Sequence, residues 1–231
     1  MFRRVGVVGA GFMGPGIAEA TARGGIPVVL YEPEDGPLAR ARDRVDASLE
    51  RAVASGKLNP DEGVALRGRI AWTTELDALE DCDLVIEAIV EDLQAKGAVF
   101  AQLDARLAPH VLLASNTSSI PIAQLAAWTE HPERVVGLHF FSPVPVMRLV
   151  EVVSGLDSSP EAVARAAAFA AAIGKQPIRP GDRCGQVARF GTVPKAGAGS
   201  AESGAWRPCR ARLTVRGHLG STWHTSTPRA R

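Results

Sequence analysis

The stretch Arg4-Val5-Gly6-Val7-Val8-Gly9-Ala10-Gly11-Phe12-Met13-Gly14 decides the fold of this chain. Its first half is a short run rich in β-branched residues, which is typical of a strand buried on both faces. Its second half has the spacing Gly-x-Gly-x-x-Gly and leads directly into a helical segment. In such a unit the first glycine makes a tight turn, the second lets a pyrophosphate approach, and the third allows close packing of the helix. The stretch therefore predicts a nucleotide-binding site.

A second predicted strand, residues 27–31, ends at Glu32, about 20 residues past the glycine motif. An acidic side chain at this place accepts hydrogen bonds from the ribose hydroxyls of NAD and repels the additional phosphate of NADP. The alternative is a glycine turn in another kind of α/β protein, with Glu32 merely solvated. We expect NAD as the cofactor, bound by Gly9, Gly11, Phe12, Met13, Gly14 and Glu32.

The overall composition argues against several classes of protein. A formal net charge of +1 and a hydrophobic content of 46% give no sign of a nucleic-acid partner or of a membrane surface. No apolar run reaches the roughly 18–20 residues that a membrane-spanning helix needs. Cys82, Cys184 and Cys209 are widely separated, which favours free thiols in a reducing compartment over disulfides or a zinc site. We expect a cytoplasmic protein without a metal, a membrane or a nucleic-acid partner.

Apolar runs and helical patterns alternate along the first three quarters of the chain. Strands are expected at about residues 5–8, 27–31, 70–73, 84–90, 111–114, 134–141, 147–153 and 176–179. Longer helices are expected at about residues 14–23, 37–55, 93–107, 122–128 and 159–173, and a further one begins at Asn59-Pro60. This alternation predicts an α/β fold with a doubly wound, mostly parallel sheet of the Rossmann type.

The composition changes near Gly185. Residues 186–231 contain eight basic residues and one acidic residue, and they are rich in Gly, Ser and Arg without helical periodicity. We expect residues 1–185 to form the nucleotide-binding domain and residues 186–231 to form an irregular, disordered tail. A tail that binds phosphate or nucleic acid is the alternative, but no lysine run, aromatic platform or known motif supports it.

Polar segments follow several of the predicted strands. Ligands of doubly wound sheets lie outside the carboxyl ends of the strands. We therefore expect residues 9–13 and 115–119 to meet Glu32, Glu91 and His139 at one crevice. Convergence of separate loops is stronger support for a site than any one of these loops.

His139 is the candidate for the chemistry, because it interrupts an apolar run and Glu151 lies on the next one. Beside a nicotinamide, the imidazole can take a hydroxyl proton while hydride leaves the same carbon, and the carboxylate can stabilise the resulting imidazolium. A histidine in an apolar strand is also commonly a structural residue. Ser118 could donate to a substrate oxygen, although its loop has an ordinary turn composition.

Four segments together resemble those of one family. They are Gly9-Ala-Gly-Phe-Met-Gly14, Glu87-Ala-Ile-Val-Glu91, Ser115-Asn-Thr-Ser-Ser119 and Gly137-Leu-His-Phe-Phe-Ser-Pro-Val-Pro-Val-Met-Arg-Leu-Val-Glu-Val152. The chain resembles the L-3-hydroxyacyl-CoA dehydrogenases over about residues 3–185, and the fourth segment is the most specific. The resemblance implies NAD-dependent oxidation of L-3-hydroxyacyl-CoA to 3-oxoacyl-CoA, or the reverse reduction, in the β-oxidation of fatty acids.

The resemblance also implies roles for individual residues. His139 falls on the catalytic base and Glu151 on its carboxylate partner. Ser118 falls on a hydroxyl that acts in catalysis and contacts both the cofactor and the substrate.

Five further positions follow from the same resemblance. Glu91, Lys96 and Ser142 fall on positions that contact the cofactor, although the last is often Asn in relatives. Ser48 falls near the coenzyme A contact, and Lys57 is a candidate for its basic partner.

The resemblance ends near Gly185. Relatives continue with a helical domain that forms the dimer interface, closes over the acyl-CoA and supplies a catalytic Asn, at whose place this chain has Arg189. Our hypothesis is that residues after about 185 come from a shifted reading frame or from a comparable truncation. We therefore expect this chain to bind NAD, to turn over acyl-CoA with impaired activity, and to be monomeric or prone to aggregation.

Two alternative functions are open at this stage. The chain could be a noncatalytic dinucleotide-binding fragment. It could also be a related dehydrogenase that acts on another hydroxy acid or on a sugar acid.

Overall fold

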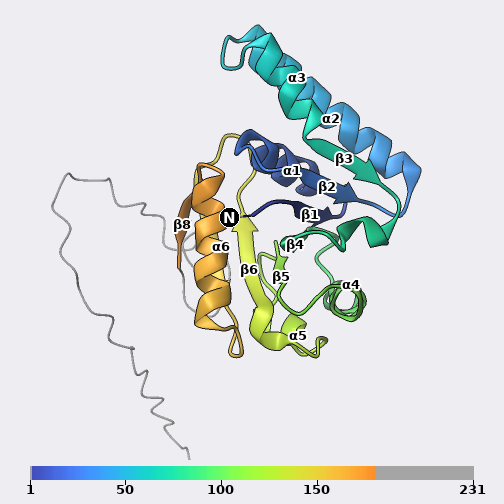
Figure 1. Cartoon of the computed structure of the whole chain (residues 1–231), viewed down its shortest axis with the longest axis vertical. Coiled ribbons are helices and arrows are strands. Elements are labelled where there is room, and N and C mark those ends of the chain that lie inside the picture. Colours follow the sequence, from blue (N-terminus) through green and yellow to red (C-terminus); the bar gives the residue numbers. More distant parts are fainter. Residues whose placement is uncertain (1, 180–231) are drawn as a thin grey trace, which may run out of the picture. The chain divides into compact units, whose positions relative to one another are not determined.

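The computed structural model describes residues 2–179, which form a single sheet with helices on both faces (Figure 1). The strands are β1 (Val5–Val8), β2 (Val28–Tyr31), β3 (Ile70–Thr73), β4 (Leu84–Glu87), β5 (Leu112–Ser115), β6 (Val135–Phe140), β7 (Leu149–Ser154) and β8 (Gln176–Ile178). The α-helices are α1 (Gly14–Arg23), α2 (Asp35–Ala54), α3 (Pro60–Gly68), α4 (Leu93–Arg106), α5 (Ile122–Ala126) and α6 (Pro160–Ala172). Two short 3-10 helices, η1 (Leu76–Leu79) and η2 (Pro132–Arg134), complete the described elements.

The strand order is β3-β2-β1-β4-β5-β6-β7-β8. All neighbouring strands are parallel except β6 and β7, which pair antiparallel with His139 opposite Glu151. The chain reverses its direction of winding between β1 and β4, so a crevice forms there at the carboxyl ends of the strands. The predicted doubly wound, mostly parallel sheet is confirmed.

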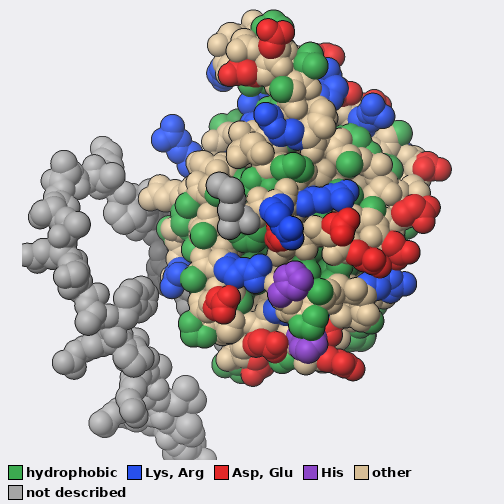
Figure 2. Space-filling model, viewed as in Figure 1, with side chains coloured by type: hydrophobic (Ala, Val, Ile, Leu, Met, Phe, Trp, Pro, Cys, Tyr) green, Lys and Arg blue, Asp and Glu red, His purple; other side chains and the backbone are tan. Residues whose placement is uncertain are grey.

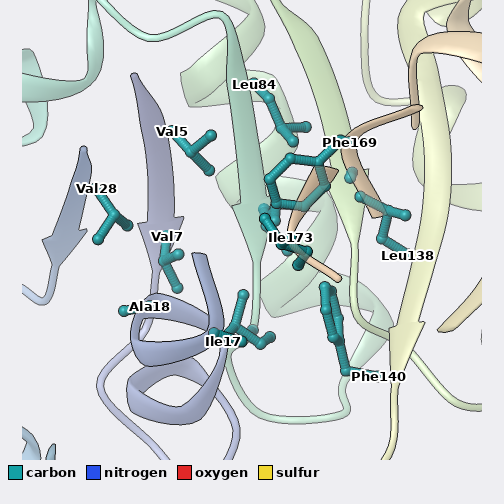
Figure 3. Packing of buried hydrophobic residues seen from close by; sticks show 14 of the residues in the cluster. Val5, Val7, Ile17, Ala18, Val28, Leu84, Leu138, Phe140, Phe169 and Ile173 are labelled. Atoms are coloured by element: carbon teal, nitrogen blue, oxygen red, sulfur yellow. The ribbon is translucent and has the colours of Figure 1, made fainter. Parts of the chain in front are cut away.

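Two separate apolar clusters lie on the two faces of the sheet. One cluster joins the strands to α1, α2, α3 and α6, and the other joins them to η1, α4 and α5. In the first cluster, Ile17 and Phe169 come from α1 and α6 and pack against strand residues such as Val7 and Leu138 (Figure 3). The strands carry apolar side chains on both faces because both faces are covered by helices.

Local sequence signals account for most helix boundaries. At the start of α3, Asn59 accepts a hydrogen bond from the backbone N–H of Glu62, whose side chain accepts one from the N–H of Asn59. This reciprocal capping fixes the helix at the predicted place. Strand β4 is shorter than expected, because the backbone N–H of Ile89 donates to the side chain of Glu87 and not to a neighbouring strand.

Helices α2 and α3 lie side by side and project beyond the β3 edge of the sheet (Figure 1). On the side seen in Figure 2, several acidic side chains gather toward the right of the view and several basic ones lie nearer the centre. None of the helices within residues 2–179 is long and apolar enough to cross a membrane. The predicted domain boundary at residue 185 and the predicted tail, including Arg189, lie outside the described residues.

Candidate active site

A cavity of about 860 Å³ opens at the carboxyl ends of the parallel strands. This volume is in the range of pockets that hold cofactors and other organic ligands. Its lining includes ten of the predicted site residues, namely Gly9, Gly11, Phe12, Met13, Glu32, Glu91, Lys96, Ser118, His139 and Ser142. The expected convergence of separate strand-end loops on one crevice is therefore present.

The glycine loop forms one wall of the cavity, between β1 and α1. Gly9 has a φ of 108°, a backbone conformation that residues other than glycine rarely adopt. A Cβ on this residue would also lie 2.8 Å from the carbonyl oxygen of Ala88. At Gly14 a Cβ would lie 1.8 Å from the carbonyl oxygen of Gly9, so only glycine lets α1 approach the loop. Gly14 does not line the cavity, and its contribution is this close packing.

Gly11 differs from the other two glycines of the motif, because a Cβ on it would meet nothing closer than 4.0 Å. Such a Cβ would occupy space at the wall of the cavity where the loop faces the opening. The backbone N–H groups at the start of α1 face the same region, and a helix N-terminus favours an anion. The loop thus has the open cradle and the donors that a dinucleotide pyrophosphate requires, so these residues fit the cofactor.

Two charged side chains hold the glycine loop at Ala10. The carboxylate of Glu32 accepts a hydrogen bond from the backbone N–H of Ala10 at 2.8 Å. From α2, the guanidinium of Arg44 donates to the carbonyl oxygens of Ala10 at 2.6 Å and of Gly11 at 3.0 Å. The loop is therefore held by an acidic residue directly after β2 and by a basic residue on α2.

His139 and Glu151 face each other across the antiparallel pair β6 and β7. Nδ1 of His139 lies 2.7 Å from Oε2 of Glu151, whose side chain is fully buried, whereas the His139 side chain is 12% exposed and lines the cavity. The carboxylate fixes the orientation of the ring, so that Nε2 is the nitrogen left for a ligand. The ring of Phe141 packs 4.6 Å from the imidazole, measured between centroids.

Glu91 organises the loop that follows β5. Its Oε1 accepts hydrogen bonds from the hydroxyl of Thr117 at 2.6 Å and from the backbone N–H groups of Ser118 and Ser119 at 2.9 and 3.1 Å. Burial raises the pKa of Glu91, but the Thr117 hydroxyl, the Lys96 charge, the Ser118 N–H and the Ser119 hydroxyl outweigh it and lower the pKa to about 2. Glu91 is therefore ionised at neutral pH, and it holds the Ser118 hydroxyl at the cavity wall.

Lys96 lies on α4, and its side chain is only 1% exposed. Its ammonium Nζ contacts Oε1 of Glu87 at 2.6 Å and Oε2 of Glu91 at 3.4 Å. Lys96 lines the cavity while Glu87 lies behind it, fully buried at the end of β4. The predicted cofactor residue Lys96 is thus part of a buried charged group.

The two predicted coenzyme A residues lie away from the cavity. Ser48 is in the second half of α2, and Lys57 is in the turn between α2 and α3. Neither lines the cavity. Their predicted role depends on a ligand that extends along α2, and it stays a prediction.

Sequence reasoning gave no individual role to four residues that build the site, although two of them, Asn116 and Thr117, lie in the loop 115–119 that was expected at the crevice. They are Arg44 on the glycine loop, Glu87 under Lys96, Asn116, whose side-chain oxygen accepts from the N–H of Phe140 at 2.9 Å, and Thr117 on Glu91. A signal was available for Glu87, because an acid at the end of an otherwise apolar strand must find a buried partner. Arg44 gave no signal, since it lies among other charged residues on a solvated helix face.

Comparison with known proteins gives a consistent result. The profile of the family described as "3-hydroxyacyl-CoA dehydrogenase, NAD binding domain" matches residues 4–183. The chain is 50% identical over 194 residues to a 3-hydroxybutyryl-CoA dehydrogenase of Mycobacterium tuberculosis, with 83% of this chain and 68% of that protein covered. It is 46% identical over 189 residues to a 3-hydroxyadipyl-CoA dehydrogenase of Escherichia coli, covering 80% of this chain and 40% of that protein.

Solved structures agree with the sequence relatives. The crystal structure of FadB2 from M. tuberculosis superposes with a TM-score of 0.78 at 50% identity, covering 80% of this chain and 65% of the other. A 3-hydroxybutyryl-CoA dehydrogenase from E. coli K12 gives a TM-score of 0.77 at 45% identity, covering 79% of this chain and 39% of the other. The chain thus spans from about two fifths to about two thirds of the length of these relatives.

Proposed function

We infer the function of this chain from one premise, which is that it belongs to the 3-hydroxyacyl-CoA dehydrogenase family through its NAD-binding domain. We propose that it carries the half-site for oxidation of an L-3-hydroxyacyl-CoA to the 3-oxoacyl-CoA, or for the reverse reduction. The observation that carries this proposal is the His139–Glu151 pair at 2.7 Å, at the wall of a cavity that also contains the glycine loop.

In the proposed reaction His139 acts as the general base. Its Nε2 takes the proton of the 3-hydroxyl group, and the buried carboxylate of Glu151 stabilises the imidazolium that forms. NAD, when bound, accepts the hydride from the carbon that bears this hydroxyl group. In the direction of reduction His139 returns the proton to the carbonyl oxygen. The Ser118 hydroxyl donates its proton to Glu91 at 3.3 Å, so it would have to turn away from Glu91 to donate a hydrogen bond to a ligand oxygen in the cavity.

The cofactor is proposed to lie along the cavity with its adenosine end at Glu32. The free carboxylate oxygen of Glu32 would accept from the ribose hydroxyls, and its charge would disfavour the additional phosphate of NADP. Gly11, Phe12 and Met13 would face the pyrophosphate. Glu91, Lys96 and Ser142 would line the remaining part, toward His139.

The position of coenzyme A is a finer proposal. Ser48 and Lys57 would contact it only if the acyl-CoA leaves the cavity along α2, toward the turn before α3. Replacing Lys57 by Ala should then raise the KM for acyl-CoA and leave the Kd of NAD unchanged.

The state of the chain in the cell is also a proposal. We propose that the protein is cytoplasmic and that its first 185 residues form the NAD-binding domain. We also propose that it is a monomer or tends to aggregate. The side chains of Phe12 and Val90 support a tendency to aggregate, because these apolar residues line the cavity and are 82% and 69% exposed. Light scattering on the purified chain tests it, and a stable dimer of defined mass would contradict it.

The activity is tested with acetoacetyl-CoA and NADH on the full 231-residue chain. We expect NADH to bind and its oxidation to be slow, to require acetoacetyl-CoA, and to disappear in His139→Gln. A chain that binds NADH but shows no oxidation above background would instead be a noncatalytic dinucleotide-binding fragment. Oxidation supported by short hydroxy acids or sugar acids, and not by acyl-CoA, would identify a related dehydrogenase.

A further inference from the structure

Glu87, Lys96 and Glu91 form one connected charged group beneath the cavity wall, here called the β4 charge cluster. Glu87 is the last residue of β4 and is fully buried. Its carboxylate receives the ammonium of Lys96 at 2.6 Å, the hydroxyl of Ser115 at 2.6 Å and the backbone N–H of Ile89 at 2.7 Å. Glu87 thus joins the end of β4, the first turns of α4 and the end of β5.

The group continues to Glu91, which lies 3.4 Å from the same ammonium. Thr117 links the two carboxylates a second time, because its N–H donates to the Ser115 hydroxyl at 3.2 Å and its own hydroxyl donates to Glu91 at 2.6 Å. Among the described residues, no buried side-chain nitrogen or oxygen is without a partner. The two buried members of the β4 charge cluster, Glu87 and Lys96, are therefore hydrogen-bonded.

The cluster has two carboxylates and a single ammonium, so its net charge is negative. Glu87 has Lys96 as its close cation at 2.6 Å, and the 38% exposed Glu91 shares the same ammonium at 3.4 Å, so one negative charge of the cluster is left to hydrogen bonds and solvent. Lys96 and Glu91 line the cavity on the side of β4 to β6, together with His139 and Ser118, whereas Glu32 lies on the side of β2. The negative charge is thus next to the part of the cavity where the reaction takes place.

We propose that the β4 charge cluster favours the oxidised cofactor over the reduced one, with Glu87 as the buried residue that sets the charge. This inference rests on the proposed binding of NAD. The oxidised nicotinamide ring is cationic and the reduced ring is neutral, while the rest of the dinucleotide is the same in both. A fixed negative charge near the ring stabilises the oxidised form selectively, whereas phosphate and adenosine contacts act on both forms equally. Glu87 acts through Lys96 and the cavity wall, and is a positioning residue that does not touch the substrate.

The quantity that tests this inference is the ratio of the Kd of NAD+ to the Kd of NADH. Removal of the Glu87 charge by Glu87→Gln keeps the size of the side chain and one of its two acceptor oxygens, while the other becomes an NH2 donor. We expect the ratio to rise by about threefold to tenfold, which is the effect of one partly screened charge on a nearby cation. Titration calorimetry for NAD+ and NADH fluorescence give the two constants on the full chain without turnover.

Two matched controls separate charge from structure. Ser115→Ala removes a hydrogen bond to Glu87 and no charge, so both affinities should change together and leave the ratio unchanged. Glu19→Gln removes a buried carboxylate that pairs with Arg23 at 2.7 Å on α1, away from the cavity lining. This variant should also leave the ratio unchanged.

A second variant covers the case in which Glu87→Gln does not fold. Glu91→Gln removes the other carboxylate of the cluster at a side chain that is 38% exposed. The ratio of the Kd of NAD+ to the Kd of NADH should rise in this variant, as it does in Glu87→Gln.

Three results would overturn the inference. The first is a ratio within twofold of wild type in both Glu87→Gln and Glu91→Gln while both cofactor forms still bind, which would leave the proposed function intact. The second is a rise of the ratio in Ser115→Ala that equals the rise in Glu87→Gln, which would show that a structural change and not the lost charge causes the effect. The third is a wild-type chain that binds neither form, which would reject the proposed function as well.

Discussion

The two ends of the cavity are built in different ways. At the glycine loop, ligand donors come from the backbone of one short segment, and the charged residues Glu32 and Arg44 hold that segment from outside. At the opposite end, the proposed functional groups are five side chains, those of Glu87, Glu91, Lys96, His139 and Glu151. Three of them, Glu87, Lys96 and Glu151, are almost completely buried.

This difference separates binding from chemistry. Backbone donors recognise phosphates that are the same in every dinucleotide, and they need only a local turn. A proton transfer needs an imidazole in one tautomer and orientation, which requires a buried carboxylate from a neighbouring strand. Substitutions at the His139 end should therefore affect turnover, while those at the glycine end should affect affinity.

The largest expected effect comes from His139→Gln. Loss of the general base should lower kcat by about 10²–10⁴-fold, while the Kd of NADH stays within twofold of wild type. Steady-state oxidation of NADH with acetoacetyl-CoA, together with NADH fluorescence titration, measures both. His131→Gln, at a histidine outside the cavity, is the control. An equal loss of NADH affinity in His139→Gln would break the separation of the two ends.

Gly11→Val should produce the opposite pattern at the other end. The valine side chain would enter the space at the cavity wall. The fold should be retained, because the nearest protein atom to a Cβ at this position is 4.0 Å away. Steric overlap of about 1–3 kcal/mol with the dinucleotide corresponds to a rise in Kd of roughly 5- to 150-fold. Circular dichroism checks the fold, and unchanged NAD+ affinity would show that the pyrophosphate does not lie at this loop.

Glu91, at the His139 end of the cavity, should also contribute to the free energy of unfolding. Its pKa of about 2 in the folded chain lies below the ordinary value of 4.5, so its stabilising contribution is present above about pH 4.5 and is lost as the pH falls toward 2. Because the side chain is 38% exposed, solvent screening reduces this contribution to about 1–2 kcal/mol.

Denaturant unfolding of wild type and Glu91→Gln measures this contribution. The difference in unfolding free energy should be largest near neutral pH and should shrink between pH 4.5 and 2. A difference that does not change with pH would contradict the assignment.

The smallest effect is expected from Arg44→Ala. Loss of the guanidinium removes a part-buried hydrogen bond to the carbonyl oxygen of Ala10 and an exposed one to that of Gly11. This should weaken NAD+ binding by about 0.5–1 kcal/mol, or roughly twofold to fivefold. Arg44→Lys should recover part of the loss, and Arg42→Ala on the same helix should have no effect. Unchanged affinity in Arg44→Ala would mean that Glu32 alone holds the loop.

The same contrast explains what the sequence could predict. The glycine loop and Glu32 are readable because a strand, a turn and a helix follow one another within 32 residues. The His139–Glu151 pair was predictable as two polar residues on successive apolar runs, although only the antiparallel register of β6 and β7 places them opposite each other.

Other parts depend on distances that no local pattern encodes. Glu87 meets Lys96 because α4 returns over the end of β4, and it meets Ser115 because β4 and β5 are in register. Arg44 meets Ala10 because α2 packs beside α1, which is a tertiary contact. Most of the other helix and strand boundaries differ from the predicted ones by one to three residues. The exact end of an element depends on its terminal hydrogen bonds, which the sequence pattern does not specify.

The most direct test of the central claim is a crystal structure of the full chain with NAD+, in which the position of the nicotinamide ring relative to residue 139 is measured. We expect the pyrophosphate at the glycine loop and the reactive face of the nicotinamide turned toward the space in front of Nε2 of His139, with Glu151 still bonded to Nδ1. A nicotinamide bound at the Glu32 end, or a His139 ring turned away from the cavity, would contradict the assignment of this chain as a dehydrogenase half-site.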